Sequence, residues 1–130
     1  MATATPFLMF QGDAQAALDL YLATFPDASA LRAERYVEGE VGPEGAIKIA
    51  VFILCGQEFM CSDSPVKHDF SFTPASSTFV QLDTVEDLEQ VFAALSEGGQ
   101  VLMPLDNYGF SQRFGWLNDR FGVSWQLNVA

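Results

Sequence analysis

The sequence has few basic residues and only one histidine. Among its 130 residues, six are Lys or Arg and seventeen are Asp or Glu, which gives a formal net charge of −11. Nucleic acids and anionic membranes are bound through clustered Lys and Arg, so this balance argues against both as partners. A Ser-His-Asp or Cys-His arrangement needs a histidine beside the nucleophile, and His68 is the only one available. Nucleophilic catalysis is therefore disfavoured, and no catalytic residue can be named.

Long apolar runs and a disulfide framework are also missing. Residues 7–10 form an apolar run that is too short for a membrane span or for the core of a signal peptide. We therefore expect a cytoplasmic protein with no membrane partner. Cys55 and Cys61 are too few for a disulfide framework. We interpret both as buried free thiols, on either side of a turn that Gly56-Gln57 suggests.

Internal similarity at an offset of seventy residues is the most informative signal in the chain. Apolar residues make up 49% of the sequence, and the length fits a single domain over residues 1–130. In each half, a short apolar strand runs into an acidic residue and then a helix. The matched pairs are Met9/Phe79, Phe10/Val80, Gln11/Gln81, Asp13/Asp83, Leu18/Leu88 and Phe25/Leu95. The sequence therefore predicts two related modules.

Each predicted helix has start and stop signals. The first begins at Asp13, a favourable N-cap, and stops before Pro26. The second begins near Thr84, with Asp87 as a weak capping box, and ends at Gly98. The apolar stripes expected to face a sheet are Ala14, Ala17, Leu18, Tyr21, Leu22 and Phe25 in the first helix and Val85, Leu88, Val91, Phe92 and Leu95 in the second.

Three strand-like runs follow each helix, so the predicted order is βαβββ twice, an α+β fold. The runs are residues 28–36, 47–54 and 58–62, then 100–105, 110–117 and 123–129. Gly56 and Gly122 occupy matching hairpin turns, where a positive φ suits glycine. The predicted boundaries are 6–64 for the first module, 65–76 for a linker and 77–130 for the second module. Two unrelated helices in an ordinary α+β domain are the alternative.

The doubled βαβββ unit resembles the vicinal oxygen chelate superfamily of glyoxalase I, bleomycin-resistance proteins and extradiol dioxygenases. The segments 9–14, 25–28, 56–60, 72–75, 103–106 and 114–127 are similar to its PhnB-like branch, often labelled a 3-demethylubiquinone-9 3-methyltransferase domain. The resemblance implies a cup-shaped mixed sheet with the helices outside, and a homodimer. Methyltransferase activity is not supported, because no glycine-rich turn for S-adenosylmethionine lies between a strand and a helix.

Catalytic members of that superfamily hold a divalent metal with four side chains on the first and last strands of the modules. The repeat places the corresponding positions at Phe7 and Ser77 (or, one residue earlier, Pro6 and Ser76) and at Met60 and Gln126. Divalent ions of this kind prefer imidazole or carboxylate ligands, whereas Gln126 offers only a neutral carbonyl and the others offer neither group. We therefore expect no metal ligands and no cofactor.

What remains is an apolar and aromatic pocket. If Trp125 and Leu127 face the helix, strand alternation turns Ser124, Gln126 and Asn128 toward the cup. By the same parity, Ser77, Phe79 and Gln81 face it from the first strand of the second module, and Trp116 with the loop 106–108 forms the rim. The candidate pocket residues are Gln126, Ser124, Trp116, Ser77, Phe79, Glu58, Met60 and Tyr108. Core packing is the alternative interpretation of Trp116 and Trp125.

Three functions are compatible with this interpretation. The first is a metal-free small-molecule-binding protein, for which aromatic faces in an acidic surround favour a cationic or aromatic ligand. The second is a metal-dependent glyoxalase- or dioxygenase-type enzyme, in which a different register would bring Glu58 into the cup and a divalent metal would be the cofactor. The third is a structural dimer subunit whose cup is filled by its own side chains.

Overall fold

The computed structural model describes all 130 residues and divides into two compact units, residues 1–69 and 70–130. The division falls inside the linker predicted at residues 65–76. Each unit contains one helix and four strands in the order βαβββ. The predicted α+β class with two βαβββ modules is therefore confirmed. Neither helix combines the length and the apolar character needed to cross a bilayer.

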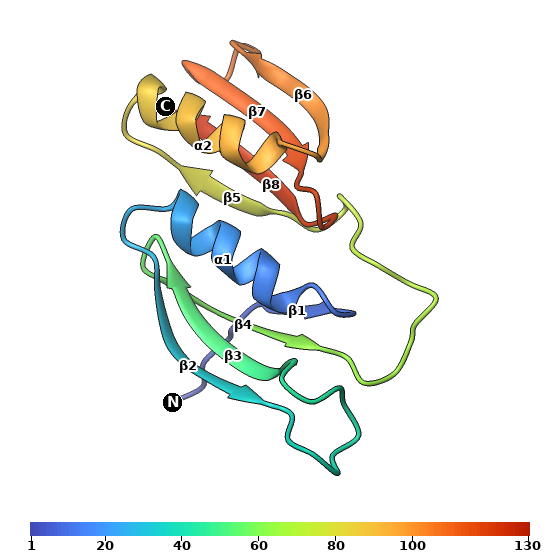
Figure 1. Ribbon diagram of the computed structural model, residues 1–130. Helices are drawn as coiled ribbons and strands as arrows, with labels where there is room; N and C mark the ends of the chain where they lie inside the picture. Colours follow the sequence, from blue (N-terminus) through green and yellow to red (C-terminus); the bar gives the residue numbers. More distant parts are fainter. The chain divides into compact units, whose positions relative to one another are not determined.

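The first unit is a mixed sheet with the strand order β1-β4-β3-β2. Strands β1 and β4 are parallel, and the other neighbours are antiparallel. Helix α1 lies against β3 and β4 (Figure 1). The elements are β1 (Phe7–Phe10), α1 (Ala14–Thr24), β2 (Ser29–Arg35), β3 (Ile47–Leu54) and β4 (Gln57–Asp63).

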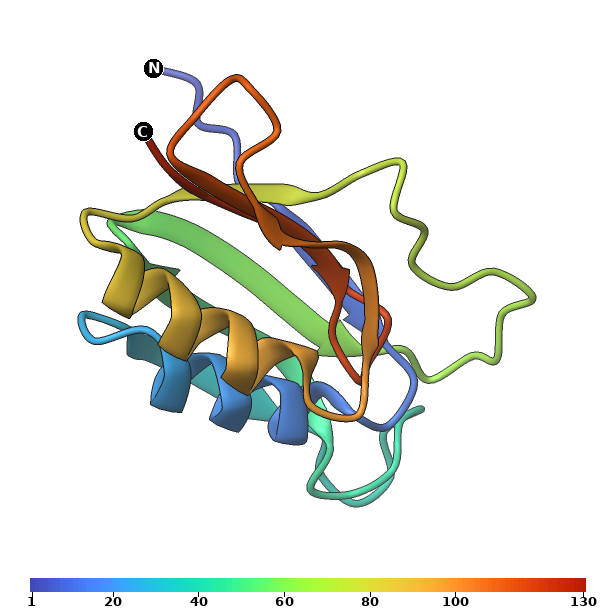
Figure 2. The ribbon, with the colours of Figure 1, turned by 90° about the horizontal axis from the view of Figure 1, so that it is seen from above.

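The second unit repeats this arrangement, with the strand order β5-β8-β7-β6. Its one parallel pair is β5 with β8, and helix α2 packs against β7, β8 and β6. Figure 2 shows the same pairing of one helix with one sheet in each unit, seen from above. The elements are β5 (Thr78–Gln81), α2 (Val85–Ser96), β6 (Gln100–Asp106), β7 (Arg113–Asn118) and β8 (Ser124–Val129). The sequence repeat is thus a repeat of topology.

The two helix starts are capped differently. Thr84 accepts a hydrogen bond from the backbone N–H of Asp87 at 3.1 Å, as the capping box predicts. Asp13, by contrast, makes no side-chain cap at α1. Asp63, at the end of β4, binds the backbone beside it instead: its Oδ1 accepts from the N–H groups of Gly12 at 2.8 Å and Ala14 at 3.0 Å. Asp13 is therefore the N-cap residue of α1, as predicted, but its side chain makes no capping bond, and a buried carboxylate from β4 binds the N–H groups on either side of it.

The first hairpin turn is one residue earlier than the sequence suggests. Leu54 and Gln57 are register partners, so the two-residue loop is Cys55-Gly56. Both loop residues have positive φ, 51° and 79°, as a type I′ turn requires. Cys61 is buried, as predicted, but Cys55 is exposed because it sits in the turn. Both thiols are free.

The start of β7 also differs from the prediction. The strand begins at Arg113 instead of residue 110, because the preceding residues form a side-chain-supported loop. Asp106 Oδ1 accepts from the Asn107 N–H at 2.7 Å, and Asn107 Oδ1 accepts from the Gly109 N–H at 2.8 Å. Local bonds of this type compete with strand pairing. The loop frees Phe110 from the sheet and leaves it exposed.

Helix α2 and its sheet approach each other closely at Gly115. A Cβ atom at this position would lie 2.6 Å from the Phe92 ring and 2.7 Å from Leu105 Cδ2. Only glycine fits such a contact without displacing its neighbours. Leu88 and Leu95, on the predicted stripe of α2, are fully buried. The register partner of Gly115 is Leu127, so this contact also fixes which face of β8 meets the helix.

Candidate functional site

The face of the second sheet opposite α2 carries the polar residues of β8. Leu117 and Leu127, both fully buried, pair with Trp125 and Gly115 respectively, on the side of the sheet that meets α2. Side chains alternate along a strand, so Ser124, Gln126 and Asn128 point the other way. We call this the open face of the second sheet. Its orientation is the one that the parity of β8 predicts.

Three side-chain hydrogen bonds tie the open face together across its strands. Gln126 Nε2 donates to Ser77 Oγ at 2.6 Å, and Asn128 Nδ2 donates to Gln81 Oε1 at 2.9 Å. Both bonds join β8 to β5 or to the residue before it. Trp116 Nε1, on β7, donates to Ser124 Oγ at 2.9 Å. The structure therefore brings Ser77, Trp116, Ser124 and Gln126 onto one surface, as the candidate pocket requires. Ser124 itself is buried, and its hydroxyl is already used by Trp116.

An aromatic cluster covers one end of the open face. The rings of Phe79 and Phe114 stack with their centroids 6.4 Å apart, and Phe79 is 54% exposed. Phe110 meets the Phe114 ring edge-on at 5.0 Å, and Tyr108 meets it edge-on at 6.1 Å. We call Phe79, Tyr108, Phe110 and Phe114 the aromatic cluster. Phe114 is buried beneath the other three, and the exposed rings of Phe79, Tyr108 and Phe110 offer faces for stacking or for cation–π contact.

The sequence interpretation included Phe79 and Tyr108 but missed Phe110 and Phe114. Phe114 is two residues before Trp116 on β7, so the alternation that places Trp116 on the open face also places Phe114 there. That signal was available in the sequence. Phe110 was assigned to a strand, although it lies in the loop before β7, and no periodicity predicts its position there.

Two amide oxygens on the open face are enclosed and lack a hydrogen-bond donor. They are Asn118 Oδ1 and Asn128 Oδ1. Asn118 pairs with Ser124, and Asn128 pairs with Phe114, so both residues belong to this face. Enclosed polar atoms nearly always have a partner, so these two oxygens are exceptions, and their enclosure keeps them out of reach of a ligand on the surface.

The predicted metal-holding corners do not provide ligands for a divalent ion. In the first unit, Phe7 lies opposite Met60, and neither side chain can coordinate a hard cation. In the second unit, the Gln126 amide is bonded to the Ser77 hydroxyl, and both groups are neutral. No group of three or more His, Cys, Asp or Glu side chains is placed to hold a metal ion. The residues present therefore do not fit the metal of the catalytic relatives.

The remaining candidates of the first unit lie on its β4 strand. Glu58 and Met60 are two residues apart, so they share a face, opposite to that of the buried Phe59. Glu58 is exposed and pairs with Ile53 across the β3–β4 hairpin. His68 lies in the loop after β4. Its ring Nε2 is 2.9 Å from Ser64 Oγ, and its backbone N–H donates to Gln11 Oε1. Glu58 and His68 therefore lie at separate positions and make no shared cluster.

Known proteins resemble the chain over nearly its full length. A family model described as 3-demethylubiquinone-9 3-methyltransferase matches residues 2–128. A solved structure from Bacillus cereus, a putative 3-demethylubiquinone-9 3-methyltransferase (PhnB protein), is 48% identical, with a TM-score of 0.95 over 99% of this chain and 100% of that one. The Escherichia coli protein YjdN is 25% identical and covers 97% of this chain and 94% of its own length.

A more distant structure shows the wider fold group. The E126Q mutant of the fosfomycin resistance protein FosX from Listeria monocytogenes, solved with Mn(II) and dihydroxypropylphosphonic acid, has a TM-score of 0.66 at 9% identity. The alignment covers 98% of this chain and 90% of that one. At this identity the likeness concerns the fold alone.

Proposed function

Because the chain belongs to the 3-demethylubiquinone-9 3-methyltransferase family, the PhnB-like branch of the glyoxalase and bleomycin-resistance superfamily, we propose that it binds a small organic molecule on the open face of its second sheet without using a metal ion. The observation that carries this proposal is the hydrogen bond from Gln126 to Ser77. These two neutral groups lie at positions where catalytic members of the superfamily, by the resemblance, have the side chains that bind the metal ion.

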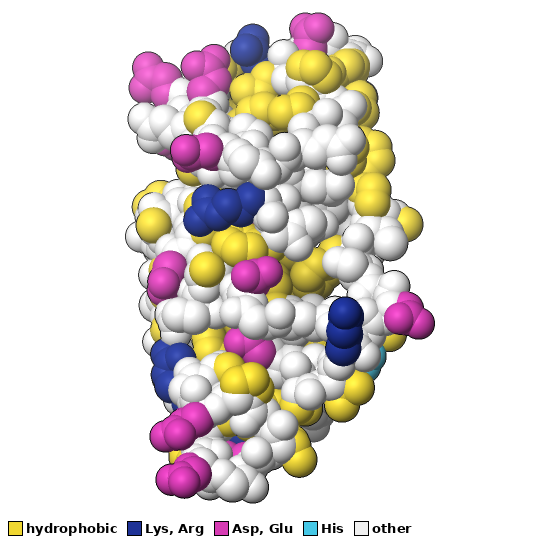
Figure 3. Space-filling model, turned by 45° about the vertical axis from the view of Figure 1, so that its right-hand side comes forward, with side chains coloured by type: hydrophobic (Ala, Val, Ile, Leu, Met, Phe, Trp, Pro, Cys, Tyr) yellow, Lys and Arg dark blue, Asp and Glu magenta, His cyan; other side chains and the backbone are white.

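The chemistry of the open face supports a cationic ligand with an aromatic body. The exposed rings of Phe79, Tyr108 and Phe110 present π-faces that attract cations. The formal net charge of −11 attracts cations at long range. Figure 3 shows acidic side chains distributed over the visible face, with few basic ones among them.

Methyl transfer is not part of the proposal. Binding of S-adenosylmethionine in the usual way needs a crevice at the carboxyl ends of several parallel strands, with a glycine-rich turn into a helix. Each sheet here has one parallel pair, β1 with β4 or β5 with β8. The turn from β1 into α1 contains a single glycine, Gly12, and its N–H is bonded to Asp63.

Titration with benzamidinium, an aromatic cation with N–H donors, tests the proposal. Backbone amide NMR spectra should show shifts at Phe79, Trp116 and Gln126. Phe79→Ala removes an exposed ring at little cost to folding and should weaken binding about fivefold, the loss of one cation–π contact worth about 1 kcal/mol. Val101→Ala is the matched control, because Val101 is also exposed but pairs with Leu117 on the helix side of the sheet.

The control variant should bind benzamidinium as the unmodified protein does. Equal benzamidinium affinity of the Phe79→Ala and Val101→Ala variants would show that the aromatic cluster is not part of the binding site. An absence of shifts with benzamidinium, together with shifts for the neutral analogue benzamide, would contradict a cationic ligand. Shifts with neither compound at millimolar concentration would contradict ligand binding by this face.

A further inference from the structure

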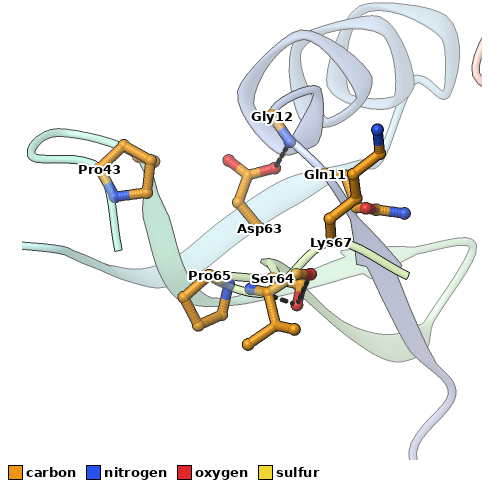
Figure 4. Close-up of a pocket in the computed structure, with 9 residues that line it drawn as sticks. Gln11, Gly12, Pro43, Asp63, Ser64, Pro65 and Lys67 are labelled. Carbon is orange, nitrogen blue, oxygen red and sulfur yellow. Dashed lines mark hydrogen bonds between the residues drawn. The ribbon is translucent and has the colours of Figure 1, made fainter. Parts of the chain in front are cut away.

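The first unit contains a cavity of about 380 Å³ at the start of α1. Its walls come from three segments: the turn from β1 into α1, the loop before β3, and the residues that follow β4 (Figure 4). Pro43, Ala46, Pro65 and Val66 make much of the lining apolar. This volume is at the small end of the range for ligand pockets. The cavity uses none of the residues of the open face.

The segment after β4 is held in place by its own hydrogen bonds. Ser64 Oγ donates to the Val66 carbonyl at 2.8 Å and accepts from the Val66 N–H at 3.1 Å. The His68 N–H donates to Gln11 Oε1 at 3.0 Å, which joins this segment to the residue that follows β1. Ser64 Oγ and Gln11 Oε1 are therefore hydrogen-bonded within the protein, and these bonds hold the cavity wall in position.

Asp63 is the chemical centre of this cavity. The residue is only 3% exposed, and Oδ1 accepts both hydrogen bonds, from Gly12 and Ala14. Oδ2 has no donor from the protein. The enclosed side-chain atoms without a partner belong to Arg113, Asn118 and Asn128 only. It follows that Asp63 Oδ2 is not sealed off, and Figure 4 shows this second oxygen turned toward the Pro43 side of the cavity.

No basic side chain pairs with Asp63. The ion pairs of the chain join Arg32 to Glu34, Lys48 to Glu40 and Arg113 to Glu89. Lys67 lines the same cavity, but its side chain extends on the Gln11 side, away from the free oxygen (Figure 4). A buried carboxylate is expensive without a counter-charge. The arrangement leaves a place for a positive group next to Oδ2, among apolar walls.

We propose that this cavity is a second binding site, which takes a primary ammonium group carried on a short apolar body. The ammonium donates to Asp63 Oδ2 on the Pro43 side, and the apolar body contacts Pro43, Ala46 and Val66. An anionic ligand is disfavoured, because the carboxylate lies in the same cavity. The proposal does not depend on ligand binding by the open face, since the two sites share no residue.

Propylammonium, propanol and propionate differ in their polar head group and serve as probes on the unmodified protein. The expected result is that propylammonium shifts the backbone amides of Gly12, Ser64 and Lys67 in NMR spectra. For propanol the same shifts should indicate at least tenfold weaker binding, and propionate should cause no shifts. These shifts are separate from those at Phe79 and Gln126, so failure of this site and failure of the open face can be told apart.

Asp63→Asn is the informative variant. An asparagine Oδ1 can keep the bonds from Gly12 and Ala14, while an amide N–H₂ replaces the oxygen that faces the cavity. We expect propylammonium binding to fall at least tenfold. Asp13→Asn is the matched control: it removes the same charge at the same helix start, but Asp13 makes no side-chain cap and does not line the cavity. The Asp13→Asn variant should bind propylammonium as tightly as the unmodified protein does.

Lys67→Gln provides a test of opposite sign. Removing a positive charge from the cavity wall should leave propylammonium binding equal or tighter, whereas an anion site would be weakened. Three results would overturn the proposal: stronger shifts with propionate than with propylammonium, equal binding by the Asp63→Asn and Asp13→Asn variants, or shifts confined to the second unit. The first of these needs no variant, so it holds even if Asp63→Asn fails to fold.

Discussion

Replacing Asp119 tests whether the β7–β8 turn depends on one buried carboxylate. Asp119 is 2% exposed. Its Oδ1 accepts from the N–H groups of Phe121 at 2.9 Å and Val123 at 3.1 Å, and its Oδ2 accepts from Trp125 Nε1 at 3.0 Å. The turn leads directly into β8, so the same carboxylate positions Gln126 on the open face.

The size of the effect follows from the donors that would be left unpaired. Val123 N–H and Trp125 Nε1 are buried, and each loses its acceptor in Asp119→Ala. A buried donor without a partner costs about 2 kcal/mol, so the alanine variant should lose about 4 kcal/mol of unfolding free energy. Asp119→Asn keeps one oxygen for the turn but sets an amide N–H₂ against Trp125 Nε1. We expect it to lose about 2 kcal/mol.

Chemical denaturation followed by tryptophan fluorescence measures these values. Both tryptophans, Trp116 and Trp125, belong to the second unit, so the signal reports on the unit that contains the turn. In a Trp125→Phe background the competing donor is gone, and Asp119→Asn should cost clearly less than in the unmodified protein. If Asp119→Ala and Asp119→Asn both stay within about 0.5 kcal/mol of the unmodified protein, the range of an ordinary surface change, Asp119 does not hold the turn.

Two further predictions concern packing and thiol chemistry. Gly115→Ala should destabilise the second unit by about 1–3 kcal/mol in the same denaturation assay, because its Cβ would overlap the Phe92 ring and Leu105; a variant as stable as the unmodified protein would refute the close contact. Burial, with the nearby Asp63 carboxylate, raises the pKa of Cys61 from 9.0 to about 12. Iodoacetamide at pH 8 should therefore modify exposed Cys55 and spare Cys61 until the protein unfolds, as mass spectrometry can show. Because the unfolded thiol loses its proton near pH 9 and the native thiol keeps it, stability should fall as pH rises from 9 toward 12, and Cys61→Ala should reduce that fall.

Elements with a regular apolar pattern were predictable from the sequence. The stripe of α2, with Leu88 and Leu95 at its centre, and the alternation of β8 around Gln126 each depend on a short-range period that packing enforces. Because the two halves are similar in sequence, the helices and strands assigned in one half could also be assigned in the other. For the same reason, the open face and most of its polar residues followed from strand parity once one face of β8 was assigned to the helix.

Features that depend on contacts between distant segments were not predictable. Asp63 is 49 residues from Ala14, and nothing in the local sequence indicates that it binds the backbone N–H groups at the start of α1. The cavity beside Asp63 is formed by loops, for which no periodicity exists. The late start of β7 arises from side-chain bonds of Asp106 and Asn107, which compete with a strand that the apolar residues alone favour.

The most direct test of the metal-free account is a benzamidinium titration performed before and after exhaustive dialysis against EDTA, with metal content measured by mass spectrometry on protein purified without chelators. The account predicts the same dissociation constant in both samples and no stoichiometric divalent metal in either. A contradiction would be one equivalent of a divalent metal per chain that disappears in a Gln126→Leu variant, together with loss of benzamidinium binding on dialysis.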